Sequence, residues 1–93
     1  MSETFPINKY KLTVHALFEM TRRGLNEKDV AQVILKPEQS ELLRPGRVVF
    51  QSRIKWVDLQ KMYLLRVIVD IDREPAEIVT VYRTSKVEKY WRV

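Results

Sequence analysis

Two stretches in the first third of the chain place apolar residues at the spacing of an amphipathic helix. In the first, Val14, Leu17 and Phe18 fall on one side of a helix, and this pattern predicts that they form its buried stripe. Thr13 is a residue type that caps helix starts, and Gly24 suits the left-handed position just beyond a helix end. The pattern therefore predicts a first helix between Thr13 and Gly24.

The second stretch follows immediately. Asn26 is expected to cap it, and Val30, Val33 and Ile34 form a predicted apolar face before Pro37 ends the helix. The short connection between the two helices predicts a tight helical hairpin.

Beyond a turn at Pro45 and Gly46, the apolar period changes to two. Residues 48–56 alternate as in a half-buried strand, and residues 63–71 are apolar on both sides apart from Arg66 and Asp70. A connection is predicted at residues 58–61.

A third strand is predicted at residues 78–83, and a short helix capped by Ser85 follows it. A further strand at residues 9–12 has only a weak pattern. The order of elements predicts a single α+β domain over residues 1–93. In it, two N-terminal helices pack on a three- to four-stranded antiparallel meander, followed by a short C-terminal helix.

Composition narrows the classes of function. The chain has 93 residues, no cysteine, one histidine and a net charge of +5, and no apolar run is long enough to span a bilayer. We expect a cytoplasmic protein with no membrane segment, no metal site and no cofactor. The positive charge favours a phosphate polymer or an acidic protein as partner.

Arg66 is the most informative charged position, because it interrupts the most apolar strand. An unpaired buried charge is costly, so Arg66 must pair with an acid such as Glu77 or open onto a polar site. The hairpin register decides its neighbours on the next strand. An odd loop puts Arg66 opposite Thr80, and an even loop puts it opposite Val81 and beside Arg83.

The other candidates are His15 and the C-terminal segment. His15 is the only imidazole, and it is either a proton carrier or a surface residue on a salt-bridged helix face. The C-terminal segment mixes cations, hydroxyls and rings, which suit phosphate and bases. Each cation there has the alternative of being a solvated side chain, and Trp91 is expected to hold the segment against the sheet. The candidates in and near this segment are Arg53, Thr80, Tyr82, Arg83, Ser85, Lys86 and Tyr90.

Three stretches resemble the bacterial family called domain of unknown function 4258. They are residues 15–30 (HALFEMTRRGLNEKDV), residues 64–69 (LLRVIV) and residues 80–86 (TVYRTSK). The resemblance extends from about residue 12 to residue 91, and the departure from it lies at residues 51–61. The family is similar in layout to RelE-like and barnase-like metal-independent ribonucleases, many of which are toxins of toxin–antitoxin pairs.

The resemblance implies an endoribonuclease that works without metal by attack of the RNA 2′-hydroxyl. His15 would then be the base or acid, Arg66 and Lys86 would hold the phosphate, and Tyr82 would orient or donate a proton. RNA contacts would come from Arg53, Thr80, Arg83, Ser85 and Tyr90. The RNA would be free or ribosome-associated, and an acidic antitoxin would be a protein partner. The alternative is a module that binds RNA or protein without catalysis.

Overall fold

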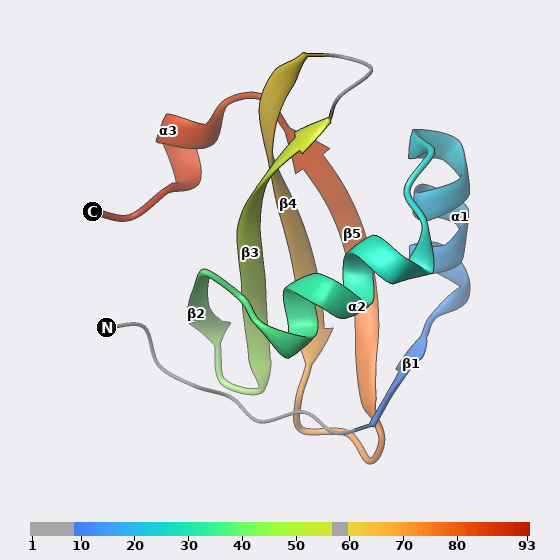
Figure 1. Cartoon of the computed structure of the whole chain (residues 1–93). Coiled ribbons are helices and arrows are strands. Elements are labelled where there is room, and N and C mark those ends of the chain that lie inside the picture. Colours follow the sequence, from blue (N-terminus) through green and yellow to red (C-terminus); the bar gives the residue numbers. More distant parts are fainter. Residues whose placement is uncertain (1–8, 57–59) are drawn as a thin grey trace.

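A five-stranded sheet forms the centre of the computed structural model, which describes residues 9–56 and 60–93 (Figure 1). In space the strand order is β1-β5-β4-β3-β2. Strands β2 to β5 pair antiparallel, whereas β1 runs parallel to β5. The strands are β1 (Tyr10–Leu12), β2 (Gln39–Arg44), β3 (Arg47–Trp56), β4 (Lys61–Asp70) and β5 (Ala76–Thr84), and the helices are α1 (Val14–Arg23), α2 (Glu27–Leu35) and α3 (Val87–Tyr90).

The predicted fold class is wrong, because the sheet has five strands and is mixed rather than a three- to four-stranded antiparallel meander. Strand β2 was not predicted, since polar residues occupy its first three positions and two leucines follow in succession, which gives no alternation. Parallel pairing of β1 with β5 makes the sheet mixed. The first two residues of the connection predicted at residues 58–61 lie outside the described residues, Gln60 is a turn residue, and Lys61 already belongs to β4.

The ends of α1 and α2 follow the predicted capping residues, whereas the cap predicted for α3 at Ser85 is wrong, because Lys86 precedes that helix and no side chain caps it. The Thr13 hydroxyl accepts a hydrogen bond from the Ala16 amide at 3.1 Å and donates to the Ile78 carbonyl at 2.9 Å. Gly24 adopts the left-handed conformation (φ 68°) just after α1, and the Asn26 side chain accepts from the Asp29 amide at 2.9 Å. The bond from Thr13 to β5 also anchors the start of α1 on the sheet.

The burial predicted for α1 is wrong. Val14, Leu17 and Phe18 are 84%, 48% and 61% exposed, whereas Ala16 and Met20 are buried. The small Ala16 side chain lets α1 approach β5 closely, so the helix packs through the Ala16–Met20 side. The predicted apolar face of α2 is confirmed, since Val30, Val33 and Ile34 are all buried.

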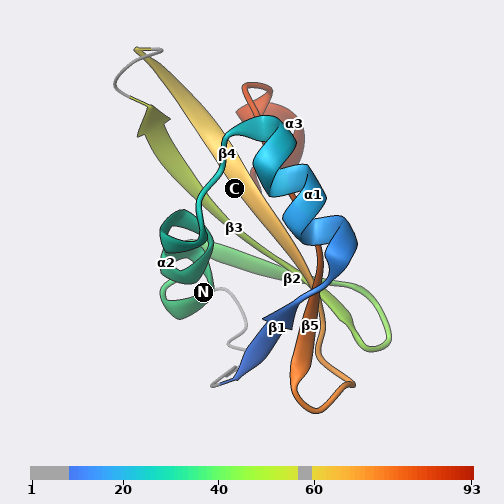
Figure 2. The same cartoon turned by 90° about the vertical axis from the view of Figure 1, so that its right-hand side faces the viewer.

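Both α1 and α2 cover one face of the sheet, which we call the helix face. Their buried residues form a single core with Phe50 of β3, Val67 of β4 and Val81 of β5. The C-terminal segment (residues 86–93), which includes α3, lies on the other face, and Figure 2 shows α2 and α3 on opposite sides of the strands. We call this second face the tail face.

A bulge in β5 sets which residues reach the tail face. Ile68 pairs with Thr80, but the next residue of β4, Val69, pairs with Ile78, so Val79 has no cross-strand partner. The extra residue shifts the register by one, and Arg66 lies opposite Tyr82 rather than opposite either residue considered from loop length.

Candidate nucleic-acid interface

Arg66 lies near the centre of the tail face and is only 7% exposed. Its Nε donates to Gln51 Oε1 at 3.0 Å, and its Nη1 donates to the Tyr82 hydroxyl at 2.5 Å. The Tyr90 ring lies over the guanidinium, with the Arg66 Cζ 4.1 Å from the ring centroid. Neutral polar atoms and aromatic rings therefore surround this cation.

No carboxylate forms an ion pair with Arg66 among residues 9–56 and 60–93. Glu77, the acid considered as its partner, instead pairs with Lys11 of β1 at 3.2 Å. Burying a guanidinium without a counterion costs free energy that its hydrogen bonds only partly recover. Arg66 thus has the properties of a preorganised anion-binding group.

A row of amide side chains continues from Arg66 across the sheet. Gln39, Gln51, Arg66 and Tyr82 lie directly opposite one another on four neighbouring strands. The Gln51 amide nitrogen donates to Gln39 Oε1 at 2.8 Å, so the row is hydrogen-bonded from β5 to β2. Gln39 and Gln51 were missed as site residues, because only the observed register reveals that they lie beside Arg66.

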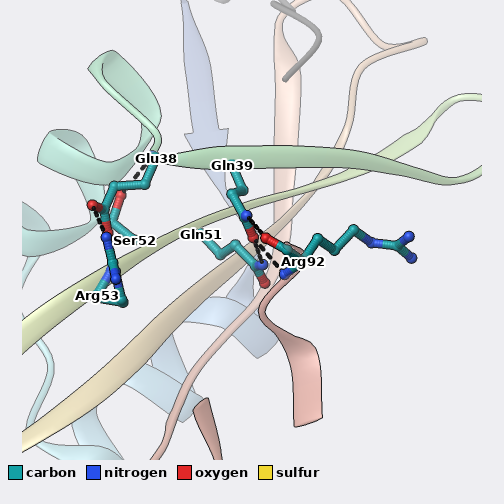
Figure 3. Close-up of polar contacts among 6 residues, drawn as sticks. All are labelled: Glu38, Gln39, Gln51, Ser52, Arg53 and Arg92. Atoms are coloured by element: carbon teal, nitrogen blue, oxygen red, sulfur yellow. Dashed lines mark hydrogen bonds and ion pairs between the residues drawn. The ribbon is translucent and has the colours of Figure 1, made fainter. Parts of the chain in front are cut away.

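The C-terminal segment lies across this row (Figure 3). Gln51 donates to the Tyr90 carbonyl at 3.1 Å, and Gln39 exchanges two hydrogen bonds with the Arg92 backbone, at 2.5 and 3.1 Å. The Trp91 ring covers Arg53, whose Cζ is 4.0 Å from the ring centroid. Two consecutive aromatic residues are therefore stacked on two arginines of the tail face.

The pKa values of the two tyrosines beside Arg66 are shifted in opposite directions. Burial raises the pKa of the Tyr82 phenol, and the Arg66 cation only partly opposes this effect. A hydrogen bond with Lys89 lowers the pKa of Tyr90, whose ring centroid lies 6.4 Å from that of Tyr82. Tyr82 therefore keeps its proton at neutral pH and can act as a hydrogen-bond donor to an anion.

The remaining candidates on this side of the molecule lie around Arg66. Thr80 follows the same alternation as Tyr82 and faces the tail face, and Arg53 is held by Glu38 through Nε and Nη2 at 3.2 and 3.1 Å (Figure 3). Ser85 and Lys86 are exposed where the chain leaves β5, and the Lys86 amide donates to the Thr84 hydroxyl. These positions form a rim between the sheet and α3.

His15 and Arg83 do not belong to this group. His15 is exposed on α1, the helix that packs on the helix face of the sheet. On the same helix, Glu19 pairs with Arg22 at 2.7 Å. Arg83 points to the helix face, where its Cζ lies 4.9 Å from the Trp56 ring centroid. The sheet separates His15 from Arg66, so the structure does not bring the predicted catalytic set together.

The described residues contain no cluster of three His, Cys, Asp or Glu side chains that could hold a metal ion. Within the same ranges, none of the helices has the length and apolar character needed to cross a bilayer.

The family model for a domain of unknown function, DUF4258, matches residues 12–83. The chain belongs to this family. The match contains the last residue of β1, all of β2 to β4, both helices of the hairpin and nearly all of β5, so Arg66, Gln51 and Tyr82 lie within the DUF4258 domain and the C-terminal segment lies beyond it. No curated protein and no solved structure matches the chain, so the expected likeness to RelE-like and barnase-like ribonucleases gains no support from those comparisons.

Proposed function

We propose that the protein binds single-stranded RNA through the tail face, with Arg66 holding a phosphate group. The observation that carries this proposal is the buried Arg66 guanidinium, which no carboxylate of the described residues neutralises. A phosphate oxygen would supply the missing negative charge. Gln51 and Tyr82 fix the orientation of the guanidinium before the ligand arrives.

The surroundings of Arg66 support RNA over a small anion. Lys86 and Lys89 form no ion pair within the described part of the chain, and both are exposed beside the tail face. Together with the net charge of +5, they would attract the phosphates on either side of the one at Arg66. The amides of Gln39 and Gln51 on the same face can hydrogen-bond to the edges of bases.

The test is the affinity for a short fluorescent single-stranded RNA, measured by anisotropy over a range of salt concentrations. Arg66→Gln is expected to weaken binding by about 10- to 100-fold, the loss typical of one charged hydrogen-bonding group. The slope of log affinity against log salt is expected to fall by about 0.7, because one phosphate contact is lost. Arg22→Gln removes the same charge from α1 and is the matched control, with little expected change. Equal affinities of the wild type and Arg66→Gln would refute the proposal.

Metal-independent cleavage of the bound RNA is the second candidate function. The specific observation in its favour is the 2.5 Å hydrogen bond between Arg66 and Tyr82, whose raised pKa keeps a proton beside the proposed phosphate site. Arg66 would stabilise charge on phosphorus, solvent water would accept the proton of the attacking 2′-hydroxyl, and Tyr82 would protonate the leaving 5′-oxygen and regain its proton from water. His15 lies on the other side of the sheet from Arg66 and Tyr82, so this proposal does not use it as the base or acid that the family resemblance implies.

Cleavage is tested with purified protein in EDTA, on free and ribosome-bound RNA. Tyr82→Phe keeps the ring and is expected to abolish cleavage while RNA binding persists, whereas His15→Ala is expected to leave both unchanged. If the wild type is inert on every RNA, the protein is a binding module. A toxin role and an acidic antitoxin partner depend on cleavage being found, and until then they rest on the family's layout and the net charge of +5.

A further inference from the structure

The C-terminal segment makes contacts on the tail face that a strand of nucleotides would also make. Tyr90 and Trp91 are consecutive, and each ring lies over a different guanidinium, with the Cζ of Arg66 and of Arg53 at 4.1 and 4.0 Å from the respective ring centroids. The carbonyl oxygens of Tyr90 and Arg92 accept hydrogen bonds from the amides of Gln51 and Gln39. Proteins recognise unstacked bases through the same two kinds of contact. An arginine stacks on the flat base, and an amide donates a hydrogen bond to a carbonyl oxygen of the base.

We infer that residues 90–92 occupy the site of two consecutive nucleotides of single-stranded RNA, and that RNA displaces them when it binds. The inference rests on the proposed function, since it requires RNA to bind at Arg66. It identifies the ligand as an unpaired strand whose neighbouring bases replace Tyr90 on Arg66 and Trp91 on Arg53. It also reverses the role expected for Tyr90, whose ring would compete with a base rather than stack on one.

The way the segment is attached favours displacement. Helix α3 has only four residues, no side-chain cap at its start and no buried residue. The Arg92–Glu41 ion pair is exposed, and the core on the helix face contains no residue of the segment. Leaving the sheet would break these contacts and uncover Val49 and Leu64, which are buried on the tail face, but it would leave the core on the helix face intact.

Displacement is also required for access. With the segment in place, Arg66 is only 7% exposed and the Tyr90 ring covers the guanidinium. A phosphate or base can reach Arg66 only in molecules whose segment has left the tail face. The apparent affinity for RNA is then the intrinsic affinity reduced by the fraction of open molecules.

The full-length double variant Tyr90→Ala/Trp91→Ala tests this inference. It removes both rings, leaves both arginines in place, and is expected to bind the labelled single-stranded RNA about 5- to 30-fold more tightly than the wild type, because two cation–π contacts no longer favour the closed form. Phe18→Ala removes an exposed ring from the opposite side of the molecule and is the matched control, with unchanged affinity.

The outcomes separate this inference from the proposed function. Tighter binding by the double variant, together with weaker binding by Arg66→Gln, supports both. If the double variant binds equally or more weakly while Arg66→Gln still loses affinity, the rings do not compete with bases and the inference is overturned. If no protein binds RNA, both proposals fail.

Tryptophan fluorescence gives an independent measurement. The chain has two tryptophans, so Trp56→Phe leaves Trp91 as the single emitter. Adding RNA is expected to shift the Trp91 emission to the red as its ring leaves Arg53 and enters water. Quenching without a red shift would mean that Trp91 stays on the sheet and stacks on a base, which overturns the inference.

Discussion

The ion pair between Arg47 and Asp70 predicts a specific link between pH and stability. These residues lie directly opposite each other on β3 and β4, and Arg47 donates through Nε and Nη2 to the two carboxylate oxygens at 2.7 and 3.0 Å. The hydrogen bonds from Arg47 lower the pKa of Asp70 below its ordinary value, and burial only partly opposes them. The perturbation is Asp70→Asn, which keeps the shape of the side chain and removes its charge.

The size of the effect follows from burial. An exposed ion pair contributes about 0–1 kcal/mol, whereas removing one partner of a fully buried pair costs about 3–5 kcal/mol. The side chains of Arg47 and Asp70 are 30% and 11% exposed, which places the pair between these limits. We expect Asp70→Asn to lower the free energy of unfolding by about 2 kcal/mol at neutral pH, equivalent to a drop of roughly 8–16 °C in Tm for a domain of this size.

The sign of the pH dependence is fixed by the direction of the pKa shift. The pKa of Asp70 is lower in the folded than in the unfolded state. The contribution of the Asp70 charge to the free energy of unfolding is therefore complete above the unfolded pKa of about 3.9, and it is lost as pH falls through the folded pKa. Urea unfolding of the wild type and Asp70→Asn at a series of pH values should show two curves that converge in acid.

A control comes from the same row of charges across the sheet. Glu77 pairs with Lys11 at 3.2 Å, but the Lys11 side chain is 60% exposed, so Glu77→Gln is expected to cost less than about 1 kcal/mol. A difference between the wild type and Asp70→Asn that stays constant into acid, or one no larger than the Glu77→Gln effect, would refute the reasoning.

Five further substitutions at four positions test local features of the fold by chemical or thermal unfolding. Thr13→Ala removes both the cap of α1 and its bond to β5, so it should cost about 1–2 kcal/mol, while Thr13→Ser should cost much less. Gly46→Ala should cost about 1–2 kcal/mol, because φ is +82° there and the new methyl group would meet the Asp72 side chain; a neutral result would show that the turn relaxes. Phe18→Ala should change the free energy of unfolding by no more than about 0.5 kcal/mol, whereas Met20→Ala should lower it by about 2–5 kcal/mol. A larger loss from Phe18→Ala than from Met20→Ala would mean that α1 buries the side predicted from periodicity.

Local signals in the sequence predicted the helical hairpin well, because capping depends on neighbouring residues. Thr13, Gly24 and Asn26 each act on the backbone within three or four positions, and each does so as expected. The rotation of α1 was not predictable in this way. The apolar stripe of Val14, Leu17 and Phe18 faces water. The helix contacts the sheet through Ala16 instead, because β5 comes close to α1 there. The apolar period of the sequence carries no information about that distance.

The candidate site was predicted in part for the same reason. Arg66 stood out as a charge in an apolar strand, and that reasoning needed no partner strand. Its neighbours Gln51 and Tyr82 depend on the register of two hairpins, and one of these is shifted by the bulge. His15 was grouped with Arg66 because it is the only imidazole and because of the family resemblance, and the placement of α1 on the helix face separates the two residues.

The unpaired Val79 divides β5 into two parts that have separate tasks. Before it, Ile78 is buried under the helices and its carbonyl anchors α1; after it, alternate residues Thr80 and Tyr82 point to the tail face. If all of β5 paired with β4 in one regular register without the bulge, Val81 would take the place of Tyr82 opposite Arg66 whenever Ile78 stayed opposite Val69, so either the anchor of α1 or the hydroxyl beside Arg66 would turn to the wrong side of the sheet. The bulge at Val79 therefore lets one strand serve both the hydrophobic core and the binding surface, because it gives the residues on its two sides the faces that they need.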